Sequence, residues 1–338
     1  MNTKNILVLG MIGIFALTSC SDDDSDDMMQ EEVSANLYAT SHANGDVTRY
    51  NLTTNSVTTI STSTSDAEGI YYSPDDDSFT LASRGMTQTS LQTYVGISDI
   101  ITATINLTVD ISSQPVLQNP RDLAVNDNFY VVADSQNANA GRFFVFEKSN
   151  GSLTLSRTIT TDFSVWGIEF IGNDLYAVVD NTNELAVFTN FLSSNTADAT
   201  VSASKRIAIE GIGRTHGIAF DGGTLIMSDI AAASGPGADT DGGFHVITNF
   251  MSKFNAVANG GTLAVGQQIR YAGAATMMGN PVNVEYDAAS DTVYVAELAN
   301  GGGRVLAFGN VSTAGGGNAT PAINNSLSGV SSLYFYRG

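Results

Sequence analysis

The sequence predicts an all-β protein, namely a six-bladed β-propeller of four-stranded antiparallel blades. Three short sequence patterns recur in a fixed order through residues 36–338. Copies of the first pattern lie 53, 45, 50 and 66 residues apart, and a four-stranded propeller blade takes about 40–50 residues. Hydrophobic residues make up 43% of the chain, which excludes a disordered acidic protein.

The first pattern is a short apolar strand that follows a small or polar residue and precedes a turn rich in Asp, Asn or Gly. Residues of these three types favour tight turns, so the chain is expected to reverse direction there. The first strand of each propeller blade lines the central channel. We assign this role to residues 68–72, 121–125, 166–170, 216–220 and 282–286.

The second and third patterns supply the next two strands of each blade. The second is an apolar strand that usually ends in an acid, at residues 129–134, 175–180, 225–229 and 293–297, or in serine, at residues 37–41 and 79–83. The third alternates with period two, at residues 45–50, 90–94, 141–146, 184–188, 243–247 and 303–308. A weaker fourth strand follows most of these, for example at residues 153–155 and 205–209.

The acids that end the second pattern are open to two interpretations. They could form an acidic collar that collects cations or a cationic partner. Alternatively, each carboxylate could accept hydrogen bonds from the backbone of a neighbouring loop. Recurrence at one position of the repeat favours the second interpretation for Asp134, Asp180, Asp229 and Glu297.

The two ends of the repeat array predict how the ring closes. The array begins with a second pattern at residues 36–38, and the missing sixth copy of the first pattern is found at residues 332–336. The C-terminal strand should therefore complete the N-terminal blade, which removes open sheet edges. A seventh blade would have to hide in residues 95–120, so we predict six, with the longest insertions at residues 231–241 and 251–268.

The N-terminal residues 1–19 predict a signal peptide. Lys4 gives a positive start, and the apolar run at residues 6–17 is too short to span a membrane. The run leads to Cys20, the only cysteine, and residues 17–20 resemble a bacterial lipobox. This resemblance implies a membrane anchor of diacylglycerol and palmitate on Cys20. The alternative is an ordinary secretory signal.

An acidic tether, residues 20–35, separates Cys20 from the propeller at residues 36–338. Its Asp-rich start resembles the surface-export signal of Bacteroidota lipoproteins, which implies an outer-membrane protein exposed on the cell surface. The alternative is a solvated spacer on the periplasmic side. The tether also divides the formal net charge of −20, because the propeller itself carries −14. With 14 Lys and Arg against 34 Asp and Glu, a nucleic-acid partner is excluded.

The order of the patterns resembles that of NHL-repeat propellers and of the related gluconolactonase-type six-bladed propellers. Residues 119–125, 129–134 and 141–146 form the copy most similar to the repeat. The resemblance covers nearly the whole predicted propeller. It implies the fold and leaves the chemistry open, since one propeller scaffold carries many functions.

The residue just before each first strand should reach the mouth of the central channel. These positions hold an acid, a base, an aromatic ring and an imidazole, and converging polar groups beside apolar surface suit a small-ligand site. We predict a ligand site there, against the alternative that each side chain packs locally, as a lone tryptophan often does. The candidate ligand-binding residues are Glu68, Arg121, Trp166, His216 and Asn283 (or Val282), with Ser331 at the sixth position.

Gluconolactonase-type enzymes hold a divalent cation at this mouth, through a Glu in a Glu-Gly-Pro motif and later Asn and Asp ligands. Glu68 and Gly69 match that motif, but Ile70 replaces the proline. Arg121 occupies the Asn position, unless that position is shifted to Asn119, and His216 occupies the Asp position. An arginine would repel calcium, which prefers oxygen ligands. Glu68 and His216 remain candidates for another metal such as zinc.

Three functions therefore compete, and the sequence favours the first of them. The first is a non-catalytic surface propeller that binds a protein, a glycan or a small molecule at the channel mouth. The second is a metal-dependent lactonase or hydrolase of the gluconolactonase type. A scaffold subunit without a small-molecule site is the third class. His42, His216 and His245 lie in unrelated settings without a nucleophile motif, so no catalytic triad is predicted.

Overall fold

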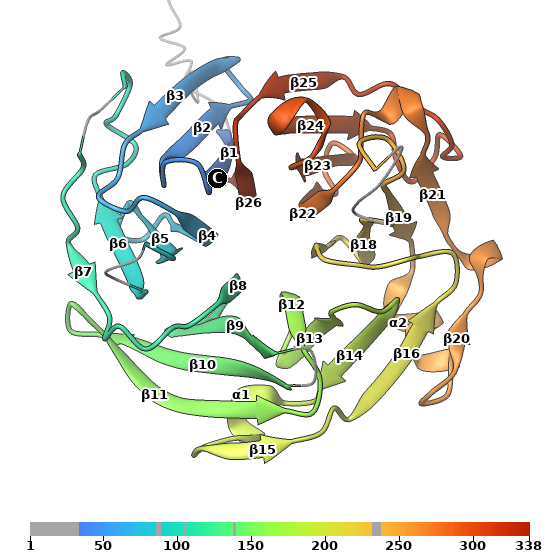
Figure 1. Cartoon of the computed structure of the whole chain (residues 1–338), viewed down its shortest axis with the longest axis horizontal. Coiled ribbons are helices and arrows are strands. Elements are labelled where there is room, and N and C mark those ends of the chain that lie inside the picture. The colour runs from blue at the N-terminus through green and yellow to red at the C-terminus, as the bar shows by residue number, and fades with distance from the viewer. Residues whose placement is uncertain (1–33, 86–88, 104–105, 138–139, 232–237) are drawn as a thin grey trace, which may run out of the picture. The chain divides into compact units, whose positions relative to one another are not determined.

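Six separate sheets surround a central channel in the computed structural model (Figure 1). The structure describes residues 34–85, 89–103, 106–137, 140–231 and 238–338. The predicted signal peptide and all of the predicted tether except its last two residues lie outside these ranges, as does Cys20. No helix in the described ranges is long and apolar enough to cross a membrane.

Each blade contains four antiparallel strands, as predicted, with the innermost strand named first here. Blade 1 contains β26 (Val330–Arg337), β1 (Ala35–Ser41), β2 (Val47–Asn51) and β3 (Ser56–Ile60). Blade 2 contains β4 (Ala67–Ser73), β5 (Ser78–Ser83), β6 (Leu91–Val95) and β7 (Ile111–Ser112). Blade 3 contains β8 (Pro120–Asn126), β9 (Phe129–Asn137), β10 (Ala140–Ser149) and β11 (Ser152–Thr161).

The other half of the ring repeats the same order. Blade 4 contains β12 (Val165–Ile171), β13 (Asp174–Val179), β14 (Glu184–Phe188) and β16 (Lys205–Ile209). Blade 5 contains β17 (Ile218–Asp221), β18 (Thr224–Asp229), β19 (Gly243–Ile247) and β21 (Ile269–Ala272). Blade 6 contains β22 (Pro281–Asp287), β23 (Thr292–Glu297), β24 (Arg304–Gly309) and β25 (Ile323–Ser326).

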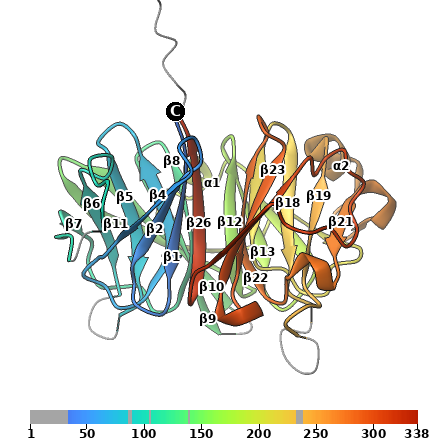
Figure 2. The ribbon, with the colours of Figure 1, turned by 90° about the horizontal axis from the view of Figure 1, so that it is seen from above.

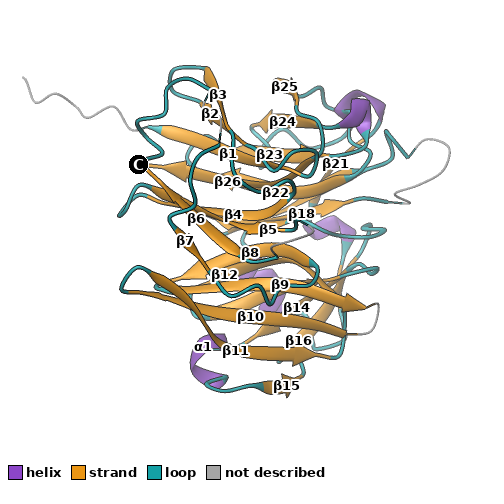
Figure 3. Ribbon diagram, turned by 60° about the vertical axis from the view of Figure 1, so that its left-hand side comes forward, coloured by secondary structure: helices purple, strands orange, loops and turns teal. Residues whose placement is uncertain are grey.

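The outer edges carry elements that the repeat patterns do not predict. The short strand β15 (Ala199–Val201) pairs in parallel with β11, and β20 (Thr262–Leu263) pairs in parallel with β16. Two short helices, α1 (Phe191–Ser194) and α2 (Phe250–Ala256), follow the third strands of blades 4 and 5, and their buried phenylalanines pack between neighbouring blades (α1 is labelled in Figures 1 and 3). The long insertion of blade 5 thus adds a strand to the outer edge of blade 4 and covers it.

The predicted closure of the ring is confirmed. β26 pairs antiparallel with β1, with Leu37 opposite Phe335 and Ser41 opposite Val330. The described chain therefore enters and leaves blade 1 at the same end, near Ala35 and Arg337 (Figure 2). Ser41 and Val330 lie at the other end of these strands, on the opposite face of the propeller.

The core consists of six apolar clusters, one between each pair of neighbouring blades. Alternate residues of one strand serve two clusters, because successive side chains of a strand point to opposite faces. In β9, for example, Tyr130 and Val132 pack toward blade 2, while Val131 and Ala133 pack toward blade 4. This two-sided burial explains why the second pattern is a nearly continuous apolar run.

In or next to each innermost strand, one residue comes especially close to the next blade, and we call these residues the ring positions. They are Gly69, Asp122, Gly167, Gly217, Asn283 and Ser332. Three of them are polar, and each accepts a backbone N–H of the next blade. Asp122 accepts that of Ile168, Asn283 that of Leu333, and Ser332 that of Gly69. Where the ring position is glycine, the next backbone comes so close that an added Cβ would lie within 3 Å of it.

Candidate functional site

Five of the six predicted mouth residues lie at the starting ends of the innermost strands, and His216 lies two residues before β17. They occupy the face opposite the ends of blade 1 at Ala35 and Arg337. Arg121 lies within electrostatic range of Glu68 of blade 2 and Asp180 of blade 4. Side chains from neighbouring blades therefore converge at this mouth, as the patterns predict.

Trp166 lies at the centre of a stack of three planar side chains. The His216 ring is parallel to the indole, with centroids 3.6 Å apart and an interplanar angle of 4°. The Arg121 guanidinium carbon lies 4.0 Å from the Trp166 centroid. Two groups this close cannot share one face of the indole, so Arg121 and His216 cover opposite faces. Trp166 is thus a platform for Arg121, and both of its faces are occupied within the protein.

His216 is a neutral and deeply buried ring. Its Nε2 lies 3.5 Å from Oδ1 of Asp180, which also accepts hydrogen bonds from Nε and Nη2 of Arg214. Burial lowers the pKa of His216 to about 4, because the charged imidazolium loses its hydration and also faces Arg214. At neutral pH this imidazole packs against the indole, and Arg214 is the cation that balances Asp180.

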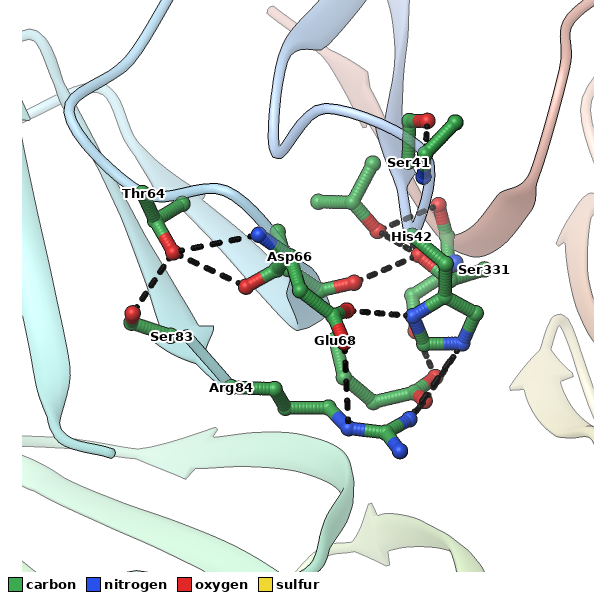
Figure 4. A network of polar contacts seen from close by, with 12 residues as sticks. Ser41, His42, Thr64, Asp66, Glu68, Ser83, Arg84 and Ser331 are labelled. Carbon is green, nitrogen blue, oxygen red and sulfur yellow. Dashed lines mark hydrogen bonds and ion pairs between the residues drawn. The ribbon is translucent and has the colours of Figure 1, made fainter. Parts of the chain in front are cut away.

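Glu68 takes part in a network of four charged groups (Figure 4). Its Oε2 accepts a hydrogen bond from Nη1 of Arg84 at 2.8 Å and lies 3.1 Å from Nε2 of His42. The Nδ1 of His42 lies 2.6 Å from Oδ1 of Asp66. His42 follows β1 whereas Glu68 belongs to β4, so the network joins blade 1 to blade 2.

Both ring nitrogens of His42 face carboxylates, which fixes its charge. Burial by itself lowers the pKa of His42, but the hydrogen bonds to Asp66 and Glu68 outweigh it and raise the pKa to about 9. His42 is therefore an imidazolium at neutral pH. It stabilises two carboxylates and has no lone pair with which to act as a base.

A His42→Gln substitution is expected to destabilise the protein in a pH-dependent way. The folded-state pKa of His42 exceeds the value of 6.5 expected for an unfolded chain. Its stabilising contribution is therefore complete below about pH 6.5 and is lost as the pH rises through about 9. Urea unfolding at pH 6 and pH 10 should show a large difference from wild type at pH 6 and a small one at pH 10. A difference that is equal at both pH values would contradict the charged network.

Asn283 and Ser331 serve the ring and its closure. Asn283 is a ring position whose Oδ1 accepts the Leu333 N–H, so its side chain spans two blades. The β-bulge at the start of β22 matches the one at the start of β8, so Val282 corresponds to Arg121 and Asn283 corresponds to Asp122. Ser331 donates to the Ala67 carbonyl and shares a hydrogen bond with Thr40. Both side chains are buried and already bonded.

The acids that end the second strands accept backbone hydrogen bonds, as the capping interpretation predicts. Asp134 accepts the N–H groups of Gln118 and Asn119, and Asp229 accepts those of Gly213 and Arg214. Glu297 accepts N–H groups on both sides of its strand, from Gly279, Asn280, Ala299 and Asn300. These carboxylates hold the loops from which the mouth residues project.

Below the mouth, the channel contains acids that the sequence patterns do not single out. Asp122, Glu169 and Glu285 line a cavity of about 180 Å³ together with Tyr71 and Tyr334. Burial raises the pKa of Asp122 to about 7 and those of both glutamates well above their ordinary value, and repulsion from neighbouring acids adds to the effect. The sequence does contain a signal for the two glutamates. Each lies two residues after a ring position, Gly167 or Asn283, in a strand of the first pattern.

The two predicted metal ligands, Glu68 and His216, are each held by other side chains and do not come together. Glu68 is bonded to Arg84 and Ser332, whereas His216 stacks on Trp166 beside Asp180. Within the ranges that the structure describes, no three His, Cys, Asp or Glu side chains are arranged to hold a metal ion. The sequence patterns also missed His42, Arg84 and Arg214, which come from strand ends and loops outside the first pattern.

The fold and the mouth together define a propeller with a charged, aromatic channel entrance. No protein-family model matches this sequence, and no curated protein matches it. Among solved structures, a putative 6-phosphogluconolactonase from Bacteroides uniformis aligns with a TM-score of 0.61 at 12% identity, over 90% of this chain and 100% of that one. A chain of a nidogen–laminin complex aligns with a TM-score of 0.57 at 11% identity, over 89% and 98%. At these identities the likeness is one of fold.

Proposed function

We propose that this protein is a surface lipoprotein whose propeller binds a ligand at the channel mouth and does not catalyse a reaction there. The observation that carries the proposal is that side chains of the mouth are already held in place by other protein groups, before a ligand binds. Arg121 stacks on Trp166 at 4.0 Å, and its Nε donates to Ser135 Oγ at 2.8 Å. Side chains that are already ordered lose little entropy on binding, which favours affinity.

The same order argues against acid–base chemistry at the mouth. His42 is held as a cation between two carboxylates, and Glu68 is held by Arg84 and His42. His216 is neutral, but its ring nitrogens are buried and have no contact with solvent. A general base needs an available lone pair within hydrogen-bond reach of the substrate. The imidazolium of His42 has none, the carboxylate oxygens of Glu68 already have protein partners, and the nitrogens of His216 are buried.

A metal-dependent lactonase is the alternative, and it takes its support from the fold of the putative 6-phosphogluconolactonase. That alternative needs Glu68 as a metal ligand. In this chain the Glu68 side chain is only 4% exposed and is paired with Arg84. A metal would have to displace that arginine, so binding without catalysis is the function that the geometry supports better.

Trp166 allows the proposed site to be tested directly. It is the only tryptophan of the chain and lies in the mouth, so its fluorescence reports on that place alone. Full-length protein should be titrated with candidate small molecules and oligosaccharides while the Trp166 emission is followed. Ligands that raise the melting temperature should also shift or quench this emission. Stabilising ligands that leave the emission unchanged bind elsewhere and would contradict a mouth site.

Anchoring through Cys20 is a separate part of the proposal. A Cys20→Ser variant expressed from the full chain is expected to lose labelling by a palmitate analogue and to leave the outer-membrane fraction. Replacing the acids at residues 22–27 with asparagine should keep the label but abolish cleavage by protease added to intact cells. A variant without Cys20 that still fractionates with outer membranes would show that the anchor lies elsewhere.

A further inference from the structure

The cations near the mouth differ in what balances their charge. Among the described residues, Arg84 pairs with Glu68, Arg142 with Asp134, and Arg214 with Asp180. Arg270 pairs with Asp229, and Arg206, which lies farther out on β16 of blade 4, pairs with Glu184. Arg121 differs from these five, because the one hydrogen bond it makes to described residues joins its Nε to the neutral hydroxyl of Ser135.

The carboxylates around Arg121 do not neutralise it. Glu68, Asp180 and Asp134 act on Arg121 at a distance, but each has a cationic partner of its own, and Glu68 also faces the imidazolium of His42. Among the described residues, Arg121 is thus a cation at the mouth that has no carboxylate partner of its own. In a propeller with a formal net charge of −14, this is a local site of opposite sign.

The contacts of Arg121 also fix its orientation. Trp166 holds one face of the guanidinium, and Ser135 holds its Nε edge. The remaining edge, with Nη1 and Nη2, makes no hydrogen bond to the described residues. Two parallel N–H groups on a planar guanidinium match the two oxygens of a carboxylate or a phosphate.

We propose that the ligand of the mouth is anionic and that Arg121 binds its carboxylate or phosphate group through Nη1 and Nη2, on the Trp166 platform. This inference rests on the proposed binding function and adds the chemical class of the ligand to it. A neutral ligand would leave a half-buried guanidinium without a counter-charge. An anion supplies that charge in the place where the protein does not.

The test compares three sugars of one shape. Full-length protein is titrated with glucuronate, glucose 6-phosphate and glucose, and Trp166 emission and calorimetry are recorded. At least one of the two anions is expected to bind saturably and to change the emission, and glucose at the same concentration is not. The two anions distinguish a carboxylate from a phosphate ligand. Inorganic phosphate as a fourth probe shows whether the anionic group suffices without the sugar.

Variants distinguish the specific contact of Arg121 from a general effect of positive charge. Arg121→Gln should weaken binding of the anion roughly tenfold or more, because a charge-assisted bidentate contact is lost. Arg121→Lys, which keeps the charge but not the paired N–H groups, should lose part of the affinity. Arg206→Gln, which removes the same charge from the outer part of blade 4, should bind as wild type. Melting curves identify any variant that fails to fold.

Each other result overturns the inference in a recognisable way. If glucose binds as tightly as the anions and changes Trp166 emission, the mouth is a binding site, but its ligand is not selected by charge. If Arg121→Lys binds as wild type, or Arg121→Gln and Arg206→Gln weaken binding equally, the two-pronged contact is wrong. If neither sugar anion nor inorganic phosphate alters the Trp166 emission, the anionic class of ligand is wrong. The proposed mouth site is then judged by whether neutral ligands alter this emission.

Discussion

A Gly167→Ala substitution is expected to destabilise the propeller by about 3 kcal/mol or more, at the upper end of what overpacking costs in a core. A methyl group on Gly167 would lie 2.3 Å from the carbonyl oxygen of His216. That oxygen also accepts the Gly167 N–H, at 3.0 Å, and so joins β12 to the start of blade 5. Blades 4 and 5 must move apart to admit the methyl group, and the His216 ring should shift on Trp166.

Guanidinium unfolding monitored by Trp166 fluorescence measures both effects. The native emission should change with the disturbed stack, and the unfolding midpoint should fall. Gly266→Ala is the matched control, because its added methyl group meets no atom within 4 Å and its φ is not in the left-handed region. If the two variants are equally stable, the close approach of the innermost strands does not contribute to stability as proposed.

Replacing both channel glutamates, Glu169→Gln and Glu285→Gln, is expected to stabilise the protein at pH 8 by a few kcal/mol. Burial first, and then repulsion from neighbouring acids, raises the pKa of each carboxyl above its unfolded value. The folded state therefore binds these protons more tightly than the unfolded state. Stability from these groups is complete below about pH 4 and decreases as the pH rises toward the folded pKa values.

The pH dependence identifies the cause. Each unit by which a folded carboxyl pKa is raised costs about 1.4 kcal/mol once the pH exceeds that pKa. The double variant should therefore gain stability over wild type at pH 8 and lose this advantage at pH 4. Urea unfolding across this range measures it, with Asp99→Asn at an exposed position as the control for charge alone. A double variant that is less stable than wild type at pH 8 would mean that the ionised glutamates stabilise the fold.

Most of the fold follows from the sequence because its pattern is repeated and locally encoded. An apolar run such as that of β9 must be buried on both faces, and the neighbouring blades bury it. The closure also follows from the order of the patterns, since β26 supplies the copy that the N-terminal blade lacks. The added strands β15 and β20 do not follow, because they pair with edges of strands that belong to distant parts of the sequence.

The candidate site could be predicted in position but not in its contacts. The repeat places Glu68, Arg121, Trp166 and His216 at one end of the innermost strands. It does not reveal that His42 and Arg84 hold Glu68, or that Arg214 and Asp180 flank His216. These partners come from loops whose course depends on the assembled ring. The choice between Val282 and Asn283 is settled by the pairing register, which places Val282 at the position of Arg121 and Asn283 at that of Asp122.

The position of β26 in the chain also sets the order of events during synthesis. This strand is translated after every other strand of the propeller, although it pairs with the first. A nascent chain therefore has an unpaired β1 edge until the end, and such edges invite aggregation. Pairing Leu37 with Phe335 closes a loop of almost the whole domain, and contacts this distant in sequence slow folding. Ring closure should thus be the final step of maturation, and ribosomes that stop before residue 330 should release products that are aggregated or degraded.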